Sequence, residues 1–337
     1  MTSALQSPRE KSKAPMERLS IALSDELAAV DAMLNTHMHS STDLIPKVAA
    51  HLVKAGGKRV RPVLTLAAAN LCGYEGDHHI RLAAAVEFIH TATLLHDDVV
   101  DGSALRRGKP AANTVFGNKP SILVGDFLFS RAFQLMVETG SIEVLDILSK
   151  TSAIISEGEV MQLATANNLA TTEEEHLAVI RAKTAALFSA ATEVGGVLAG
   201  VSQEQRSALY TYGDRLGIAF QLADDALDYA GKASTIGKDA GDDFREGKVT
   251  QPILLAYAAA DDDERTFWKR TIEKRQQEDG DFERAMQLLA KHGAISGALE
   301  DARRYAAEAR DAISLFPESP LRNDLEDLVS YVVDRDH

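Results

Sequence analysis

The sequence predicts an all-α fold, and three observations carry this prediction. From about residue 19 onward, apolar residues recur at spacings of three and four, which is the period of an amphipathic helix. Ala and Leu are abundant, and alternating runs of β-branched residues are few. Segments such as 79–96 and 183–200 are apolar nearly all round, which indicates helices buried inside a bundle.

The expected elements follow in order from this periodicity and from the residues that interrupt it. Helices are expected over residues 19–36, 43–54, 60–71, 79–100, 120–138, 141–166, 172–198, 203–230, 248–260, 263–274, 282–292, 294–315 and 319–334. The breakers between these segments are Gly56-Gly57, Gly102, Gly108-Lys109-Pro110, Gly140 and Gly231. The pattern therefore predicts a bundle of about ten to thirteen helices.

The chain is expected to form one domain over residues 19–337. It has 337 residues, of which 45% are hydrophobic and 26% charged, which is enough for a sizeable core. Neither a Pro/Ser-rich linker nor a repeat of roughly 20–50 residues divides it. Residues 1–18 are polar and lack the apolar centre of a secretory signal. We expect them to form a disordered tail, with a short organellar transit peptide as the alternative.

Composition argues against several classes of protein. The formal charge of −14 and the pI near 5.2 argue against a nucleic-acid partner. Cys72 is the only cysteine, so neither an intrachain disulfide nor a multi-thiolate zinc site is expected, which suits a reducing cytoplasm. No segment approaches the roughly 20 consecutive apolar residues of a membrane-spanning helix, so no stable membrane anchor is expected.

Two copies of one acidic pattern carry the strongest functional signal. Both read DDxxD, and they are Asp97-Asp98-Val99-Val100-Asp101 and Asp224-Asp225-Ala226-Leu227-Asp228. Within a helix the first and fifth residues share a face, so their like charges destabilise the helix unless a cation neutralises them. Single carboxylates suit Mg²⁺, which keeps several waters and bridges carboxylates to phosphates. Two such motifs facing each other would clamp a diphosphate.

Cationic residues accompany both acidic motifs. Arg106 and Arg107, at a helix exit, offer guanidinium groups that match phosphate oxygens. The segment 56–62 (GGKRVRP) places three cations at the start of a helix, where backbone N–H groups favour an anion. His90 lies two turns before Asp97 on the same face and can donate a hydrogen bond without a permanent charge.

Lysines complete this set of residues. Lys183-Thr184 interrupts an apolar stretch, so its ammonium needs an anionic partner. The segments 237–243 and 247–252 read as a mobile loop that carries Lys238 and Lys248. Each motif alone is common as a solvated surface or a satisfied core residue. Their combination favours a diphosphate site.

In combination these motifs resemble those of trans-isoprenyl diphosphate synthases. The segments that carry the resemblance, in the family's order, are 57–62 (GKRVRP), 94–101 (LLHDDVVD), Arg106-Arg107-Gly108, Lys183-Thr184, 220–228 (FQLADDALD) and 237–239 (GKD). They span roughly residues 54–252, and the helical remainder is compatible. The resemblance implies the isoprenoid synthase fold, a single-domain bundle of mostly antiparallel helices around a deep central cavity. The two aspartate helices would face one another across its mouth.

The same resemblance implies about three Mg²⁺ ions and a role for each motif residue. Direct metal ligands would be Asp97, Asp101 and Asp224, with Asp98, Asp225 and Asp228 completing the set directly or through water. The allylic diphosphate would be held by Arg106, Lys183 and Lys238, with Lys248 nearby. Isopentenyl diphosphate would be held by Lys58, Arg61, His90 and Arg107. The reacting centre would be lined by Thr184 and Gln221.

The implied reaction is a head-to-tail (1′-4) condensation. Magnesium and the lysines stabilise the pyrophosphate that leaves as the allylic carbon–oxygen bond breaks. The double bond of isopentenyl diphosphate then attacks the carbocation, and the departing pyrophosphate takes the proton. An apolar cavity keeps water away from the cation.

Product length is expected to depend on the residues below the first motif on the same helix. Thr93 and Ala92, four and five positions before the first aspartate, are small where short-chain members carry aromatic plugs, which leaves the tunnel open. We therefore predict an all-trans octaprenyl to decaprenyl diphosphate for a quinone side chain. Phe88, one turn below Ala92, could block the tunnel, and Phe133 or Met136 on another helix could form its floor.

Two alternatives stay open, a shorter-chain (farnesyl or geranylgeranyl) synthase and a non-catalytic subunit of a heteromeric synthase. A terpene cyclase usually replaces the second DDxxD with an Asn/Ser/Glu triad, and a head-to-head synthase has different acidic spacing, whereas both motifs are intact here. The resemblance also implies a farnesyl or geranyl primer and a homodimer. The expected location is the cytoplasm, with transient membrane contact for release of long products.

Overall fold

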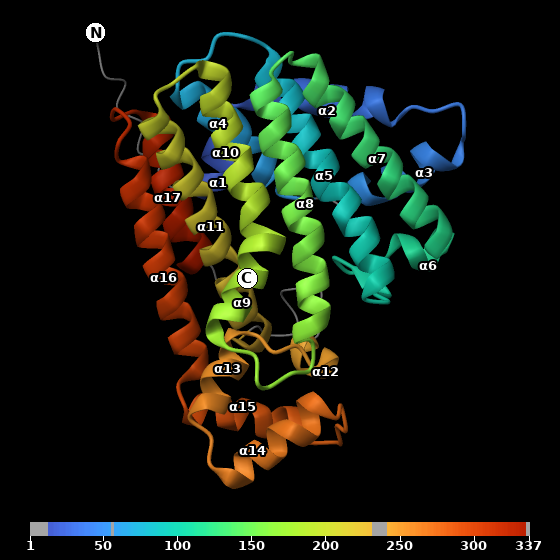
Figure 1. The fold of residues 1–337 in the computed structure, drawn as a ribbon, viewed down its shortest axis with the longest axis vertical. Coiled ribbons are helices and arrows are strands. Elements are labelled where there is room, and N and C mark those ends of the chain that lie inside the picture. Colours follow the sequence, from blue (N-terminus) through green and yellow to red (C-terminus); the bar gives the residue numbers. More distant parts are fainter. Residues whose placement is uncertain (1–12, 55–56, 231–240, 335–337) are drawn as a thin grey trace. The chain divides into compact units, whose positions relative to one another are not determined.

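The computed structural model describes residues 13–54, 57–230 and 241–334 (Figure 1). The chain forms two compact units. Unit 1 comprises residues 1–152, 187–213 and 312–328, and unit 2 comprises residues 153–186, 214–311 and 329–337. The expectation of one domain over residues 19–337 stays a prediction, as does the facing of the two aspartate helices, because the motifs belong to different units.

Unit 1 contains the first acidic motif. Its complete elements are α1 Pro15–Ala22, α2 Ser24–Met38, α3 Leu44–Lys54, α4 Val60–Leu71, α5 His78–Val100, β1 Leu105–Arg106, β2 Lys109–Pro110, α6 Ala112–Phe116 and α7 Asn118–Glu138. It shares α8 Ile142–Thr165, α10 Ala186–Ala199, α11 Gln203–Ala230, α16 Ala294–Ile313 and α17 Pro320–Asp334 with unit 2.

Unit 2 contains the second acidic motif, near the end of α11. Its own elements are α9 Glu173–Ile180, the π-helical turn η1 Arg181–Ala185, α12 Asp242–Glu246, α13 Gln251–Ala258, α14 Asp262–Trp268, the π-helical turn η2 Lys269–Glu273 and α15 Asp281–Lys291.

Helix α5 carries the first motif and is buried along most of its length, as its all-round apolar sequence predicts. Every residue from Leu82 to Ile89 is buried, and the helix packs against α2, α4 and α7. A Cβ atom at Gly125 of α7 would clash with the His96 ring of α5. A glycine therefore permits these two helices to approach closely, which fixes the frame that presents the motif.

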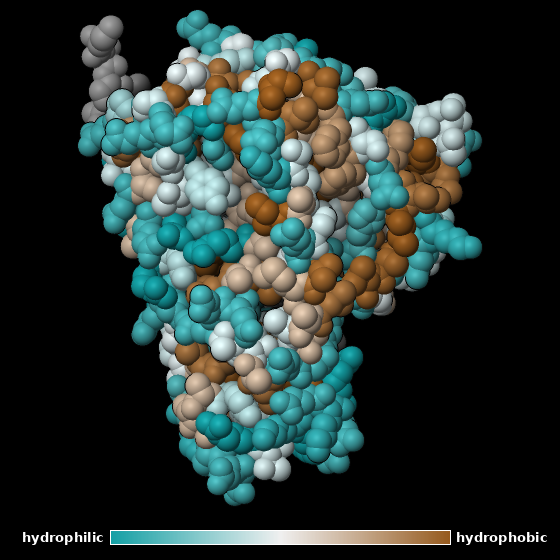
Figure 2. Space-filling view, in the orientation of Figure 1, coloured by the Kyte–Doolittle hydropathy of each residue, from teal (hydrophilic) through white to brown (hydrophobic). Residues whose placement is uncertain are grey.

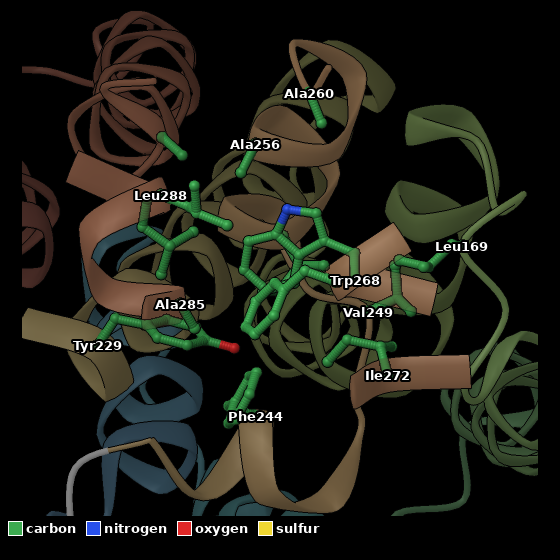
Figure 3. Packing of buried hydrophobic residues seen from close by; sticks show 14 residues of the cluster. Leu169, Tyr229, Phe244, Val249, Ala256, Ala260, Trp268, Ile272, Ala285 and Leu288 are labelled. Atoms are coloured by element: carbon green, nitrogen blue, oxygen red, sulfur yellow. The ribbon is translucent and has the colours of Figure 1, made fainter. Parts of the chain in front are cut away.

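A buried cluster in unit 2 anchors the segment that follows the second motif (Figure 3). Tyr229, directly after Asp228, lies in this cluster together with Trp268 and Phe244. Phe244 of α12 meets Trp268 edge-on, with ring centroids 6.4 Å apart. The cluster therefore packs the end of α11, which carries Tyr229, together with α12 and α14.

The predicted all-α class is confirmed, and most expected helices match within a few residues. The count of helices exceeds the expected ten to thirteen for two reasons. The expected helix over 19–36 is two helices that meet at Leu23, and five-residue helices such as α6 and α12 are too short to show a period. Helix α1 begins at Pro15, so the last four residues of the expected tail are helical.

A two-stranded hairpin was not expected. Strands β1 and β2 pair antiparallel with Arg106 opposite Lys109. The two residues of the turn, Arg107 and Gly108, have φ values of 53° and 73°, as the tight hairpin turn that fits twisted strands requires. The sequence hid this turn because an arginine occupies a position that usually favours Asn, Asp or Gly.

Candidate active site

The first acidic motif separates its aspartates by burial. Asp98 is fully buried, Asp97 is half-buried and Asp101, the residue that caps α5, is exposed. Arg106 Nε donates to both oxygens of Asp98, at 2.8 and 3.0 Å, and its Nη2 lies 2.7 Å from Oδ1. Asp98 therefore anchors Arg106, and this pairing favours Asp97 and Asp101 as the carboxylates that are placed for a cation.

A ring of arginines surrounds His90, which lies on α5 two turns before this motif. Burial and the positive charges of Arg61, Arg107, Arg106 and Arg59 hold the pKa of His90 well below its usual range. The imidazole is therefore neutral at physiological pH and adds no charge to the ring. Arg106 pairs with Asp98 and Arg59 with Glu87, and the remaining positive charge beside a neutral donor fits a multiply charged anion.

Arg61 of α4 is a half-buried cation of this group. Burial is the main cause that lowers the pKa of Arg61 to about 10; the charge of Glu87 opposes this shift, and the charge of Arg107 adds to it. The Arg61 guanidinium lies 4.6 Å from the centre of the Phe188 ring, and its Nε has no hydrogen-bond partner within the described residues. A buried N–H group without a partner costs folding free energy, so we expect a ligand to complete the hydrogen bonds of Arg61.

Glu87 is a residue of the site that the sequence reasoning missed. It lies one turn before His90 on α5, is buried, and pairs with Arg59, which also lies 3.4 Å from Asp31. Burial raises the pKa of Glu87, and the charge of Arg59 opposes that shift. The available signal was a single carboxylate inside the apolar run 82–89.

Gly57 lies directly against this ring of arginines. A Cβ atom at Gly57 would lie 2.8 Å from Arg107 Nη1. The glycine therefore leaves the space that the Arg107 guanidinium occupies.

Lys58, which follows Gly57, is exposed and lines a cavity of about 360 Å³ together with Arg59 and Pro62.

The second acidic motif repeats the pattern of the first. Its middle aspartate, Asp225, is buried, whereas Asp224 and Asp228 are half-buried. Thr184 Oγ1 donates to Gln221 Oε1 at 2.9 Å, and Gln221 Nε2 donates to Asp225 Oδ1 at 2.9 Å. The structure thus brings the predicted pair Thr184 and Gln221 together and anchors it on Asp225.

A third group of carboxylates lies beside this motif and was not predicted as part of the site. The backbone N–H of Asp243 donates to Asp228 Oδ2 at 3.1 Å. Burial and the negative charges of Asp228 and Asp225 raise the pKa of Asp243 to about 7, and Lys248 opposes that shift. Lys248 Nζ itself lies 3.6 Å from Asp243 and 2.6 Å from Glu246.

The carboxylates of the two acidic motifs suit a magnesium ion. Within the described residues, no three acidic, histidine or cysteine side chains already form a group that could hold a metal. Mg²⁺ does not need such a group, because it keeps several waters and takes one or two carboxylates together with substrate phosphates. A divalent cation would also relieve the repulsion that raises the pKa of Asp243.

Lys183 belongs to the π-helical turn η1, a distortion that is frequent at functional sites. Its Nζ donates to Glu159 Oε2 at 2.8 Å and to Gln162 Oε1 at 2.6 Å. Glu159 is therefore the anionic partner that the sequence required for this lysine. The predicted Lys238 lies outside the described residues, together with Gly237 and Asp239.

The fold and these motifs define a class of helical enzymes that act on diphosphate esters. The family described as polyprenyl synthetase matches residues 42–289, and the chain belongs to this family. Octaprenyl diphosphate synthase from Escherichia coli (strain K12) is 41% identical over 325 residues, which cover 95% of this chain and 99% of that protein.

Two solved structures agree with this membership. A decaprenyl diphosphate synthase from Rhodobacter capsulatus is 57% identical, with a TM-score of 0.92 and coverage of 96% of this chain and 99% of that one. A polyprenyl synthase from Caulobacter crescentus CB15, described as complexed with calcium and isoprenyl diphosphate, is 51% identical, with a TM-score of 0.92 and coverage of 96% and 98%. The predicted family, prenyltransferase class and isoprenoid synthase fold are confirmed.

Proposed function

We propose that this protein condenses isopentenyl diphosphate head to tail with an allylic diphosphate and releases a long all-trans polyprenyl diphosphate. The observation that carries the proposal is the pair of DDxxD motifs, each with a buried middle aspartate that anchors a residue of the site. The names of the similar octaprenyl and decaprenyl synthases support a long product. A quinone side chain is the use that we propose for it, and farnesyl or geranyl diphosphate is the proposed primer.

We propose that the arginine ring around His90 binds isopentenyl diphosphate. Arg61, Arg107 and Lys58 would hold its phosphates, and neutral His90 would donate a hydrogen bond. Lys183 in unit 2, together with Arg106, Lys238 and Lys248, would hold the allylic diphosphate. The excess of positive charge around His90 supports this division, because a bound diphosphate would neutralise it.

We propose Asp97, Asp101 and Asp224 as the Mg²⁺ ligands. About three ions would be bound, as the resemblance to trans-isoprenyl diphosphate synthases implies. When bound, Mg²⁺ would neutralise the charge that develops on the departing pyrophosphate. Asp98 and Asp225 hold Arg106 and Gln221 in place, and Asp228 accepts a backbone hydrogen bond from Asp243. The calcium in the Caulobacter structure supports a divalent cation in this family.

The residues of this chain would act on the carbocation by position and by charge. The allylic carbon–oxygen bond breaks, the double bond of isopentenyl diphosphate forms the new carbon–carbon bond, and the proton leaves with pyrophosphate. The hydrogen-bonded pair Thr184–Gln221 would present its oxygens to the cation. The buried, apolar length of α5 below the motif would shield the growing chain from water.

Product analysis tests the proposed function. The purified chain would be incubated with magnesium, labelled isopentenyl diphosphate and farnesyl diphosphate, and the dephosphorylated products would be sized. We expect polyprenols of about eight to ten units, because small residues lie below the first motif. Products of three or four units would keep the chemistry and refute the length. Inactivity with every allylic primer would instead indicate a subunit of a heteromeric enzyme.

Ala92→Phe is expected to shorten the product, because each five-carbon unit passes roughly one helical turn and Ala92 lies only five residues before Asp97. Ala92 is fully buried on α5, and Phe88 is buried one turn below it. Product sizing is the measurement, with the thermal midpoint as a check on folding, since overpacking costs about 1–3 kcal/mol. Ala92→Val is the matched control and should shift the product less. An unchanged product from folded Ala92→Phe would refute the open tunnel.

Gly57→Ala is expected to lower kcat/KM for isopentenyl diphosphate about tenfold, because the new methyl group displaces the Arg107 guanidinium. Folding should change little, since the contact falls on the flexible end of a side chain. Steady-state kinetics with varied isopentenyl diphosphate measures the effect. Gly297→Ala, whose Cβ atom would lie 3.0 Å from Leu255 Cδ1 in unit 2, is the matched control. If both variants had the same kcat/KM for isopentenyl diphosphate, Arg107 would have no part in binding this substrate.

We also propose a homodimer in the cytoplasm. Leu123 and Val137 of α7 are 65% and 61% exposed, and Figure 2 shows apolar patches on the surface that α7 forms. Exposed aliphatic side chains on one helix favour contact with a second copy. Sedimentation equilibrium should then give twice the chain mass of 36.4 kDa. None of the helices within the described residues is long and apolar enough to cross a membrane.

A further inference from the structure

Two residues of α8 hold the ammonium group of Lys183. Glu159 Oε2 lies 2.8 Å from Lys183 Nζ, and Gln162 Oε1 lies 2.6 Å from it. Both acceptors come from one face of α8, since they are three residues apart. Two contacts from one rigid helix restrict the position of Nζ.

The backbone around this contact is also tightly packed. A Cβ atom at Gly158 would lie 2.8 Å from Ala182 Cβ and 2.9 Å from the backbone nitrogen of Lys183. The glycine therefore lets α8 lie directly against η1, where the π-helical turn presents Lys183. Helix and turn thus form one rigid support beneath the lysine.

Glu159 is an unusual choice for a purely structural contact. Its Oε1 atom is buried without a hydrogen-bond partner within the described residues, although the side chain keeps 27% of its exposure. An unsatisfied buried oxygen costs free energy, so such a group is expected to serve something other than stability. The neighbouring Glu157 is exposed on the same helix and shows what an ordinary surface carboxylate looks like there.

We infer that Glu159, assisted by Gln162, is a positioning residue that orients the Lys183 ammonium for the diphosphate of the allylic substrate. This inference rests on the proposed function and adds a residue that none of the sequence motifs contains. Lys183 would meet the diphosphate already oriented, so less of the binding free energy is lost in ordering a flexible side chain. Glu159 would act only through Lys183.

A double-mutant cycle tests this inference, with Glu159→Ala, Lys183→Ala, the double variant and the control Glu157→Ala. Glu159→Ala should lower kcat with farnesyl diphosphate roughly tenfold to a hundredfold, with the KM for isopentenyl diphosphate unchanged. In the Lys183→Ala background the same change should have less than about a threefold effect, because its partner is already lost. Glu159→Gln retains an acceptor oxygen and should restore part of the rate. Glu157→Ala should match the wild type.

Titration with inorganic pyrophosphate and magnesium, followed by calorimetry, gives a second readout that needs no turnover. Glu159→Ala should weaken pyrophosphate binding roughly tenfold in the wild-type background and hardly at all in Lys183→Ala. Additive effects in both assays would overturn the positioning role and leave the proposed function intact. If the wild type forms no product but binds pyrophosphate, the proposed function fails and the titration alone decides the role of Glu159. If it does not bind pyrophosphate either, both are overturned.

Discussion

Asp97→Asn is expected to lower kcat about 100- to 1,000-fold while the free energy of unfolding stays the same or rises. Asp97 is half-buried and shares a helix face with Asp101, so removal of one charge relieves the repulsion between the two carboxylates. The loss of rate follows from the loss of a carboxylate that would hold Mg²⁺ against the leaving pyrophosphate. Steady-state kinetics over a range of magnesium concentrations, together with urea denaturation, measures both quantities.

Asp98→Asn is the matched comparison, one residue along the same motif. Asp98 is fully buried and accepts two hydrogen bonds from Arg106 Nε, so the change leaves a partly buried guanidinium without its counter-charge. Breaking such a pair costs about 3 kcal/mol of unfolding free energy. A variant of Asp98 that keeps full stability but needs far more magnesium would show that Asp98, and not Asp97, is the principal ligand.

The periodicity of the sequence was sufficient for the long helices and for the motifs they carry. Helices α5, α8 and α11 match the expected ranges within a residue or two, because each is long enough for its apolar pattern to repeat several times. The resemblance identified the family because its motifs occur in order over most of the chain. Local patterns of this kind depend on residues close together in sequence.

Contacts between distant segments could not be predicted in the same way. The partner of Lys183 is Glu159, 24 residues earlier on another helix, and the partner of Arg59 is Glu87, 28 residues later. A carboxylate in a helix has no sequence signal that names its partner, because the partner is set by how the helices pack. The burial of Asp98 and Asp225 likewise depends on packing, since all aspartates of a DDxxD motif look alike in sequence.

The arginines around His90 show a site whose stability and function oppose one another. Positive charges repel each other when they are partly desolvated; Asp98 pairs with Arg106 and Glu87 with Arg59, and the charge of Glu87 also favours the charged form of Arg61. Burial lowers the pKa of Arg61 because the charged form is less stable there than in water. The folded state keeps this unfavourable charge, as expected where an anionic ligand supplies the missing counter-charge.

Arg61→Met is therefore expected to raise the KM for isopentenyl diphosphate about 10- to 100-fold, which corresponds to the roughly 1.5–3 kcal/mol of a charged hydrogen bond. Unfolding free energy should change little, because methionine keeps the contact with Phe188 and removes a guanidinium whose charged form burial disfavours. The pKa of His90 should move up toward its usual range, since Arg61 is one of the charges that lower it. Kinetics, urea denaturation and NMR titration of the His90 ring measure the three effects.

Arg131→Met is the control for this change. The Arg131 guanidinium also lies over an aromatic side chain, 4.9 Å from the ring centre of Phe127. Arg131 belongs to α7, however, and is not one of the four arginines around His90. Its replacement should leave both the KM and the pKa of His90 unchanged. If Arg61→Met instead lowers stability and leaves the KM as it was, then Arg61 serves the packing of α4 and not the substrate. A guanidinium that is kept for packing stabilises the folded state by itself. One that is kept for a ligand stabilises the folded state only when the anion is bound.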